Sequence, residues 1–447
     1  MTMKKFIIEQ SNEELTPVTG LALVGALLRK TSLKLRLDKF TVPTCLTPDI
    51  SHGTVALSYL GLLCQGKNDF DAIELARGDD FFRYAMGVDI VPSSPTLRQR
   101  FEKVVETDLK WNDIIMEESA RLIKKAKAPL TPVRVGATDY LTVDVDVTPL
   151  DNSGSKKEGV TRTYKGHDGF APILAYLGQE GYCINVELRP GKDHSQKGTP
   201  QFLTKSINYA RQCGAEKLLV RMDSGFDSVD NIRVLRAENV DYIIKGNLRQ
   251  ETPEMWRDIA LKNGQARIVR EGKVEYMGSV MWKVGNMEQR ERVVFHVVER
   301  TILSNGQQLL LPELEVATYW TSLPVSPEEL IHLQRDHGTS EQFHSELKTD
   351  LDLERLPSGK FKVNDLVFHF GALAYNLLRI VGQMSLHHPD SPLKRKAHTQ
   401  RRRIRTVLQN VITIASRLVR HARQVKLRLG AHSPWYATFK DLYLAFS

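Results

Sequence analysis

The spacing of apolar residues changes along the chain and divides it into regions. Over residues 1–125 the apolar positions recur at helical spacing, which predicts a helical N-terminal region. Leu21, Val24, Leu27 and Leu28 show this spacing.

One segment of this region carries the start signals of a helix. Ser93 and Ser94 are capping residues, and Pro95 suits the first helical turn. Arg98 and Arg100 fall off the apolar face of this predicted helix. It is equally compatible with a DNA-contacting helix of a helix-turn-helix unit and with an ordinary surface helix.

Near residue 133 the period changes to two. Val143 and Val145 alternate with Asp144 and Asp146, so a strand here places both aspartates on one face. With this strand as the first, the order is three strands, a helix, a strand, a helix and a strand. This order predicts an α/β fold with a mixed sheet.

The later pattern completes the domain organisation. We expect the α/β core to comprise residues 126–247 and 321–385, interrupted by a separable β-rich insertion at residues 248–320. A turn at Ser304–Gly306 lies between short alternating runs of this insertion. Residues 386–447 are predicted to form a basic helical C-terminal region.

The positive charge is concentrated in that last region. Residues 391–440 hold 13 Lys and Arg and no Asp or Glu, whereas the whole chain has a net charge of +9. The rest of the chain therefore carries −4, the difference between +9 and +13. This segment favours a polyanion-binding surface, with a solvated basic face or a membrane-surface helix as alternatives.

Several classes of protein are disfavoured. The longest apolar stretch, residues 366–380, is interrupted by polar side chains and is too short to span a bilayer. The four cysteines form no CxxC pair, and the chain has no GxxxxGK[ST] loop, which argues against a disulfide framework, a structural zinc site and a phosphate-cradling NTPase. We expect a cytoplasmic protein.

Three carboxylates stand at positions suited to chemistry. Asp146 lies on the polar face of a strand, Asp223 follows an apolar strand at a glycine turn, and Glu341 begins a predicted helix. Glu341, His344 and Lys348 share one side of that helix by their three-and-four spacing. Together these carboxylates would form an all-oxygen site suited to Mg²⁺ or Mn²⁺, as in two-metal cleavage of phosphodiesters.

Each of the three carboxylates also has a non-catalytic interpretation. A strand aspartate such as Asp146 is usually a solvated residue, and Asp223 could simply favour a turn. Thr339 with Gln342 matches a capping box, so Glu341 could serve only the positive end of a helix.

Three short motifs resemble the DDE transposases of bacterial insertion sequences, in the cut-and-paste branch with a ribonuclease H-like core. These motifs are Val143–Thr148, Arg221–Phe226 and Gly338–Lys348, and the resemblance extends over about residues 133–382. The resemblance implies that Asp146, Asp223 and Glu341 bind divalent ions. Asp144 is the rival for the first position.

The branch also has a Tyr-Arg-Glu-Lys signature, from which this chain departs in part. Glu341 and Lys348 keep their places, but Gln334 and His337 stand where Tyr and Arg would be, with Arg335 nearby. Because Tyr and Arg are replaced, the resemblance does not predict how the protein binds the DNA end or whether cleavage passes through a DNA hairpin. The residues expected to contact DNA are Lys348, His337, Arg335, Arg401, Arg402 and Arg403.

The expected activity is cleavage and joining of DNA at the terminal inverted repeats of an insertion sequence. The expected partners are double-stranded repeat and target DNA and a second copy of the chain, in a bacterial, nucleoid-associated setting. The alternatives are a ribonuclease H-like nuclease or resolvase without strand transfer, and a non-enzymatic DNA-binding protein derived from a transposase.

Overall fold

The chain folds into two compact units. The computed structural model describes residues 5–40, 48–107, 110–285, 287–394, 399–422 and 424–447. The first unit comprises residues 1–104 and 377–447, and the second comprises residues 105–376. Arg395, Lys396 and Arg423 of the basic segment lie outside the described residues.

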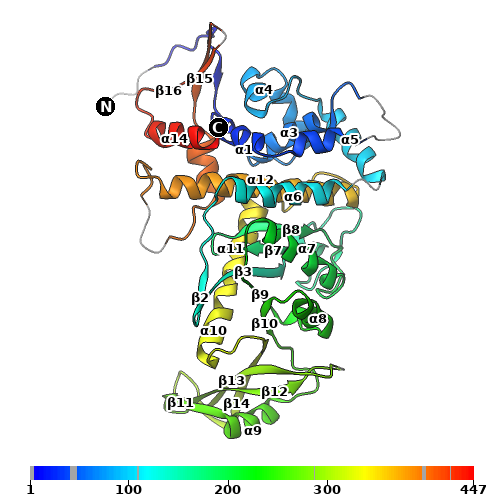
Figure 1. Ribbon diagram of the computed structural model, residues 1–447, viewed down its shortest axis with the longest axis vertical. Helices are drawn as coiled ribbons and strands as arrows, with labels where there is room; N and C mark the ends of the chain where they lie inside the picture. The colour runs from blue at the N-terminus through cyan, green and yellow to red at the C-terminus, as the bar shows by residue number, and fades with distance from the viewer. Residues whose placement is uncertain (1–4, 41–47, 108–109, 286, 395–398, 423) are drawn as a thin grey trace. The chain divides into compact units, whose positions relative to one another are not determined.

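The first unit is mainly helical (Figure 1). Its helices are α1 (Leu21–Arg29), α2 (Leu33–Asp38), α3 (His52–Leu63), η1 (Phe70–Ala76), α4 (Asp80–Met86), α5 (Ser94–Glu106), α13 (Ile404–Val407), η5 (Leu408–Ile412) and α14 (Tyr436–Phe446). Every residue of α3 is buried, so this helix lies at the centre of the unit. A Cβ on Gly25 of α1 would lie 1.7 Å from the carbonyl oxygen of Ala85, so the close approach of α1 to the end of α4 requires glycine.

The C-terminal region is not wholly helical, which corrects the prediction for residues 386–447. Strands β15 (Ser416–His421) and β16 (Gln424–Leu429) form an antiparallel hairpin, and β15 also pairs with β1 (Leu15–Thr16). Apolar residues alternate with basic ones here, at Val425, Leu427 and Leu429. This period of two, typical of a strand, was obscured by the density of positive charge.

The helix predicted after Ser93 is present as α5. Leu97 and Phe101 are fully buried on its apolar face, as its spacing predicted. Arg100 is also buried and donates to the Ile50 carbonyl at 2.8 Å, while Arg98 pairs with Asp71 at 2.9 Å. Contacts within the protein therefore hold both arginines, which favours the surface-helix interpretation over a DNA-contacting helix.

A single mixed sheet organises the second unit. Its strand order is β8-β7-β3-β9-β10-β14-β13-β12-β11, and β2 pairs with β3 at its margin. The bounds are β2 (Val133–Val135), β3 (Thr138–Val147), β7 (Ile173–Leu177), β8 (Tyr182–Glu187), β9 (Leu218–Met222), β10 (Asp241–Lys245), β11 (Gly264–Arg270), β12 (Lys273–Lys283), β13 (Arg290–Ile302) and β14 (Gln308–Thr321). β3, β7 and β8 are antiparallel, whereas β3, β9 and β10 are parallel.

Helices and a small second sheet complete this unit. The helices are α6 (Trp111–Lys125), α7 (Thr199–Gln212), η2 (Ser224–Phe226), α8 (Val229–Ala237), α9 (Pro253–Asn263) and the beginning of α12 (Phe361–His387). The small sheet has the order β4 (Leu150–Asp151), β6 (Asp168–Phe170), β5 (Thr161–Arg162). The predicted α/β class with a mixed sheet is thus confirmed.

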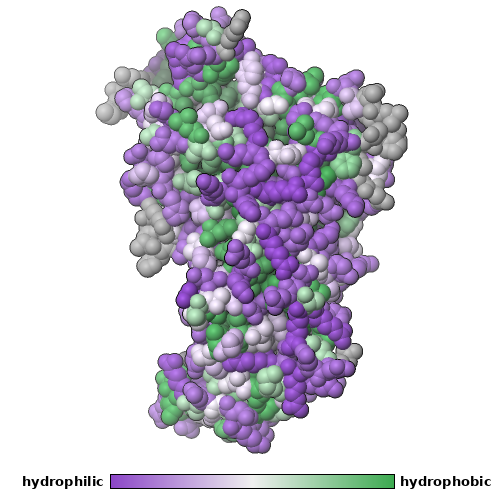
Figure 2. Space-filling view, in the orientation of Figure 1, coloured by the Kyte–Doolittle hydropathy of each residue, from purple (hydrophilic) through white to green (hydrophobic). Residues whose placement is uncertain are grey.

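The β-rich insertion is present but is not separable from the core. β14 pairs with β10, joining Ile243 to Thr321 and Lys245 to Tyr319, so β11–β14 extend the main sheet. Helix α9 packs on these strands through Trp256 and Ala260. Figure 2 shows apolar residues among hydrophilic ones on the surface of this end of the second unit. Sequence period alone could not reveal the pairing, because the paired residues are about 75 positions apart in the chain.

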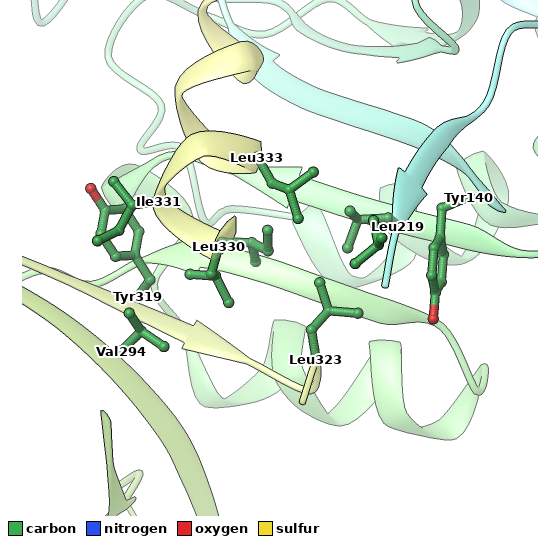
Figure 3. Packing of buried hydrophobic residues seen from close by; sticks show 10 residues of the cluster. Tyr140, Leu219, Val294, Tyr319, Leu323, Leu330, Ile331 and Leu333 are labelled. Atoms are coloured by element: carbon green, nitrogen blue, oxygen red, sulfur yellow. The ribbon is translucent and has the colours of Figure 1, made fainter. Parts of the chain in front are cut away.

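One continuous helical segment lies against this sheet. It runs through α10 (Pro327–Arg335), η3 (Asp336–Thr339), α11 (Ser340–Ser345) and a π-helical turn, η4 (Glu346–Asp350). In Figure 3, Leu330, Ile331 and Leu333 of α10 pack towards Leu219 and Tyr319 of the sheet. This packing fixes the segment relative to the ends of β3 and β9.

The predicted capping box at Thr339 is absent. Thr339 has helical backbone angles and makes no side-chain capping bond, because the helix does not begin there. Ser326 is the cap of the segment and accepts a hydrogen bond from the Glu329 amide at 3.2 Å. The capping explanation for Glu341 is therefore wrong.

No helix in the described part of the chain combines the length and apolar character needed to cross a membrane.

Candidate active site

Asp146 and Asp223 lie at neighbouring strand ends. β3 and β9 are parallel, and the last pair in their register joins Val145 to Met222. Asp146 is the next residue of β3, and Asp223 comes directly after the end of β9. In open α/β sheets, ligands bind outside the carboxyl ends of the strands, which is where these two carboxylates lie.

Asp144 is engaged in a buried ion pair. Arg221 of β9 donates to both of its carboxylate oxygens, at 2.7 and 2.8 Å, and His337 Nδ1 lies 3.0 Å from Oδ1. Burial acts to raise the pKa of Asp144, but Arg221 and His337 outweigh it and hold the pKa below its ordinary value. Its oxygens are therefore occupied by the protein, unlike those of a metal ligand.

Asp146 lies on the same face of β3 as Asp144, two residues nearer the end of the strand, and is more accessible. Its side chain is 23% exposed, against 3% for Asp144. His344 Nε2 lies 3.1 Å from Oδ2, and the Val147 amide donates to Oδ1 at 2.7 Å. Burial acts to raise the pKa of Asp146, but the His344 hydrogen bond and the nearby histidines lower it overall.

His344 is itself held from its other side. The Tyr176 hydroxyl lies 3.2 Å from His344 Nδ1, and both side chains are buried. The chain Tyr176–His344–Asp146 fixes the orientation of the imidazole and, through it, the carboxylate. The sequence placed His344 on the same helix side as Glu341, but nothing in the sequence indicated its contact with Asp146.

Asp223 and Glu341 are both exposed. Asp223 Oδ1 accepts the Gly225 amide at 2.8 Å, which anchors the turn after β9. Glu341 lies in α11, one turn before His344, and the apolar side of its helix is buried at Phe343. Both carboxylates are thus accessible to solvent.

Tyr164 lies within electrostatic range of the three carboxylates. It lies between β5 and β6, and its hydroxyl is 3.5 Å from the Val147 carbonyl oxygen. Burial raises the pKa of Tyr164 to about 12, with further contributions from the negative charges of Asp146, Asp223 and Glu341. Each of these carboxylates therefore lies close enough to act on the same phenol. No pattern in the sequence near Tyr164 indicates its place beside the carboxylates.

The carboxylates do not converge on a single point. In the residues that the structure describes, no group of three His, Cys, Asp or Glu side chains is arranged to hold a metal ion. Protein donors orient Asp146 and Asp223 instead, through His344 and the Gly225 amide. The donor chemistry nevertheless fits a hard cation, since carboxylate oxygens are the groups that Mg²⁺ and Mn²⁺ prefer.

The residues at or near the positions of the Tyr-Arg-Glu-Lys signature have different environments. Gln334 is buried and donates to the Met222 carbonyl at 3.1 Å, whereas Arg335 is exposed at the end of α10. His337 is buried against Asp144, which disfavours the DNA contact expected of it. Lys348 is half-buried and donates to the Pro149 carbonyl. Burial lowers its pKa, and its amine lies within the electrostatic range of Asp146.

The three arginines expected to bind DNA in the C-terminal region also differ. Arg402 is buried, donates to the Ser391 hydroxyl at 3.0 Å and lies over the Trp435 ring, so its side chain serves the packing of the first unit. Arg401 is half-buried and Arg403 is exposed. A DNA contact stays a prediction for these two residues and is disfavoured for Arg402.

Comparisons with known proteins give a family match over almost the whole chain. The model of a family described as transposase DDE domain group 1 matches residues 2–446. No match is found among curated proteins. A solved structure of the piggyBac transposase, in a synaptic complex with hairpin DNA, is similar at 13% identity and a TM-score of 0.43. That likeness covers 90% of this chain and 82% of the other.

Proposed function

The chain belongs to the transposase DDE domain group 1 family, and from this membership we propose that it cuts and joins DNA at the terminal inverted repeats of a bacterial insertion sequence. Hydrolysis would break a phosphodiester at each end of the element and leave a 3′-hydroxyl. That hydroxyl would then attack a phosphodiester of target DNA and displace its 3′-oxygen. Asp146, Asp223 and Glu341 are the proposed catalytic residues.

The core is proposed to be ribonuclease H-like. Three antiparallel strands, β3, β7 and β8, are followed by the parallel strands β9 and β10, each reached through a helix. This arrangement supports the proposal because it brings the ends of β3 and β9 together. The helical segment that carries Glu341 packs on the same sheet through α10.

The observation that carries the proposal is the difference between the two aspartates of β3. Asp144 is saturated by Arg221 and His337, whereas Asp146 is accessible and lies beside Asp223. Asp146 is therefore the first carboxylate in our proposal. Glu341 lies one turn before His344, which contacts Asp146, and its charge also raises the pKa of Tyr164; both observations support its place beside this pair.

Mg²⁺ or Mn²⁺ is the proposed cofactor, held by Asp146, Asp223 and Glu341. When bound, such ions would activate the attacking water or 3′-hydroxyl and stabilise the leaving oxygen. His344 keeps one oxygen of Asp146 oriented. The Lys348 ammonium is placed to attract a DNA phosphate, as a point charge beside the carboxylates.

Double-stranded DNA is the proposed partner, bound by two copies of the chain that each engage one end of the element. Arg335 and Lys348 would contact DNA beside the site, and Arg401 and Arg403 would contact it from the first unit. These contacts to phosphates would set position and affinity rather than sequence preference.

A strand-transfer assay tests this proposal. Precleaved DNA ends of the element, labelled on one strand, are incubated with the full chain, Mg²⁺ and a target plasmid. Labelled end joined to plasmid is the expected product. Cleavage of uncut ends without any joining would support the nuclease alternative instead. Binding without cleavage in Mg²⁺ or Mn²⁺ would support the DNA-binding alternative.

A further inference from the structure

The hairpin of β15 and β16 has two chemically different faces. Its register pairs Arg417 with Arg428, Val419 with Lys426, and His421 with Gln424. Because side chains alternate along a strand, these six residues share one face. The opposite face carries Ser416, Leu418, Arg420, Val425, Leu427 and Leu429.

The second face anchors the hairpin within the first unit. Leu418 is buried, and its amide donates to the Glu14 carbonyl at 2.8 Å. Arg420 pairs with Glu14 at 3.0 Å and with Asp80, and its guanidinium lies over the Tyr84 ring. The charge of Arg420 is therefore used to hold the hairpin in place.

The first face is turned to solvent and is basic. Arg417, His421, Lys426 and Arg428 are exposed, and residues 416–429 contain no Asp or Glu. Arg417 is paired with Glu13 at 3.0 Å. Neither Lys426 nor Arg428 makes an ion pair with any residue that the structure describes, so their charges face water. Figure 1 shows the hairpin extending away from α14, with β16 as its outer strand.

We propose that this face of the β15–β16 hairpin is a DNA-binding ribbon, with Lys426 and Arg428 on neighbouring phosphates of one strand. A two-stranded ribbon fits the major groove of B-DNA, which is about 12 Å wide. Side chains two positions apart on a strand are about 7 Å apart, so both cations reach one phosphate backbone together. The inference rests on the proposed function for the identity of the polyanion as DNA.

The salt dependence of binding measures these contacts directly. A fluorescent duplex of random sequence is titrated with the full chain in EDTA, at several salt concentrations, and followed by anisotropy. Each phosphate contact contributes about 0.9 to the slope of log K against log salt. Lys426→Gln and Arg428→Gln should each reduce the slope by about 0.9 and weaken binding roughly 10-fold at 0.1 M salt.

Two further variants serve as controls. Lys67→Gln removes an exposed positive charge elsewhere in the first unit and should leave the slope unchanged. Arg417→Gln should reduce the slope less than Lys426→Gln, because Glu13 already neutralises Arg417. Thermal unfolding, followed by circular dichroism, confirms that each variant is folded. Because both ribbon residues are exposed, single substitutions are not expected to alter the fold.

Several outcomes would overturn the proposal. An unchanged slope for both ribbon variants would do so, as would an equal loss for Lys67→Gln, which would show only an effect of net charge. Reduced binding to phosphatidylserine vesicles with unchanged DNA binding would assign the face to membranes instead. Since the assay uses no metal and no cleavage, its result is independent of whether the chain cuts DNA.

Discussion

Arg221 on β9 holds Asp144 on β3 through two hydrogen bonds, 2.7 and 2.8 Å long, between two buried side chains that are paired in register. This ion pair ties the two strands together directly below the ends that carry Asp146 and Asp223. The ion pair occupies Asp144 but not Asp146, although the two aspartates are only two residues apart in β3. Asp144 stabilises the sheet, and Asp146 remains accessible as the proposed catalytic residue.

Removing Arg221 should destabilise the protein strongly. Arg221→Ala leaves the Asp144 charge buried with only His337 beside it, which should cost about 3–5 kcal/mol of unfolding free energy. Arg134→Ala is the matched control, because Arg134 pairs with Asp139 at the surface and should cost about 1 kcal/mol or less. Urea unfolding measures both. If Asp144→Asn abolished cleavage without loss of stability, Asp144 rather than Asp146 would be the first catalytic carboxylate.

The continuous helical segment predicts unequal effects of two capping candidates. Ser326→Ala removes a cap that accepts the Glu329 amide and should cost about 1 kcal/mol. Thr339→Ala removes no capping bond and should change stability by about 0.5 kcal/mol or less. The same urea unfolding experiment compares them. Equal losses would mean that a helix does begin at Thr339.

His344 should act through Asp146. His344→Ala removes the donor 3.1 Å from Oδ2, so we expect a roughly 10- to 100-fold loss of cleavage and a higher Mg²⁺ concentration for half-maximal rate. His344→Gln should restore part of the activity, because its amide also donates. His332→Ala, at an exposed histidine of α10, is the control. A loss that added Mg²⁺ does not affect, with no rescue by Gln, would indicate a purely structural role.

The titration of Tyr164 should report on all three carboxylates. Fluorotyrosine at position 164 is followed by fluorine NMR as the pH is raised. Negative charge nearby favours the protonated phenol, so Asp223→Asn and Glu341→Gln should each lower the pKa of residue 164.

The control for this titration is Asp230→Asn, which removes an exposed acid of α8. It should leave the midpoint where it is in the parent protein. A midpoint that did not move in the Asp223 and Glu341 variants would mean that these carboxylates lie away from Tyr164.

Local signals in the sequence predicted local structure well. The start of α5 after Ser93 follows from capping residues and a proline, and its apolar face follows from a period close to 3.6. The strand that carries Asp144 and Asp146 follows from a period of two. These features depend on neighbours in the chain, which is why they could be read from the sequence.

Contacts between residues far apart in the chain could not be predicted from the sequence. The period of two could not distinguish Asp144 from Asp146, because the distinction depends on Arg221, 77 positions after Asp144. Likewise, His344 contacts Asp146, and Tyr164 comes within range of its charge, only after the sheet and the helical segment have packed. The hairpin of β15 and β16 differs from the predicted helix because its basic residues alternate with apolar ones, as in a strand.

Cleavage by substituted carboxylates is the most direct test of the account. DNA carrying the element's ends, labelled at the boundary, is incubated in Mg²⁺ with the parent protein and with Asp146→Asn, Asp223→Asn and Glu341→Gln, with Asp230→Asn as the control. We expect nicking at the boundary by the parent and the control, and a loss of about 100- to 1,000-fold in the three variants with DNA binding retained. Parental activity in any of the three variants would contradict the assignment of that carboxylate.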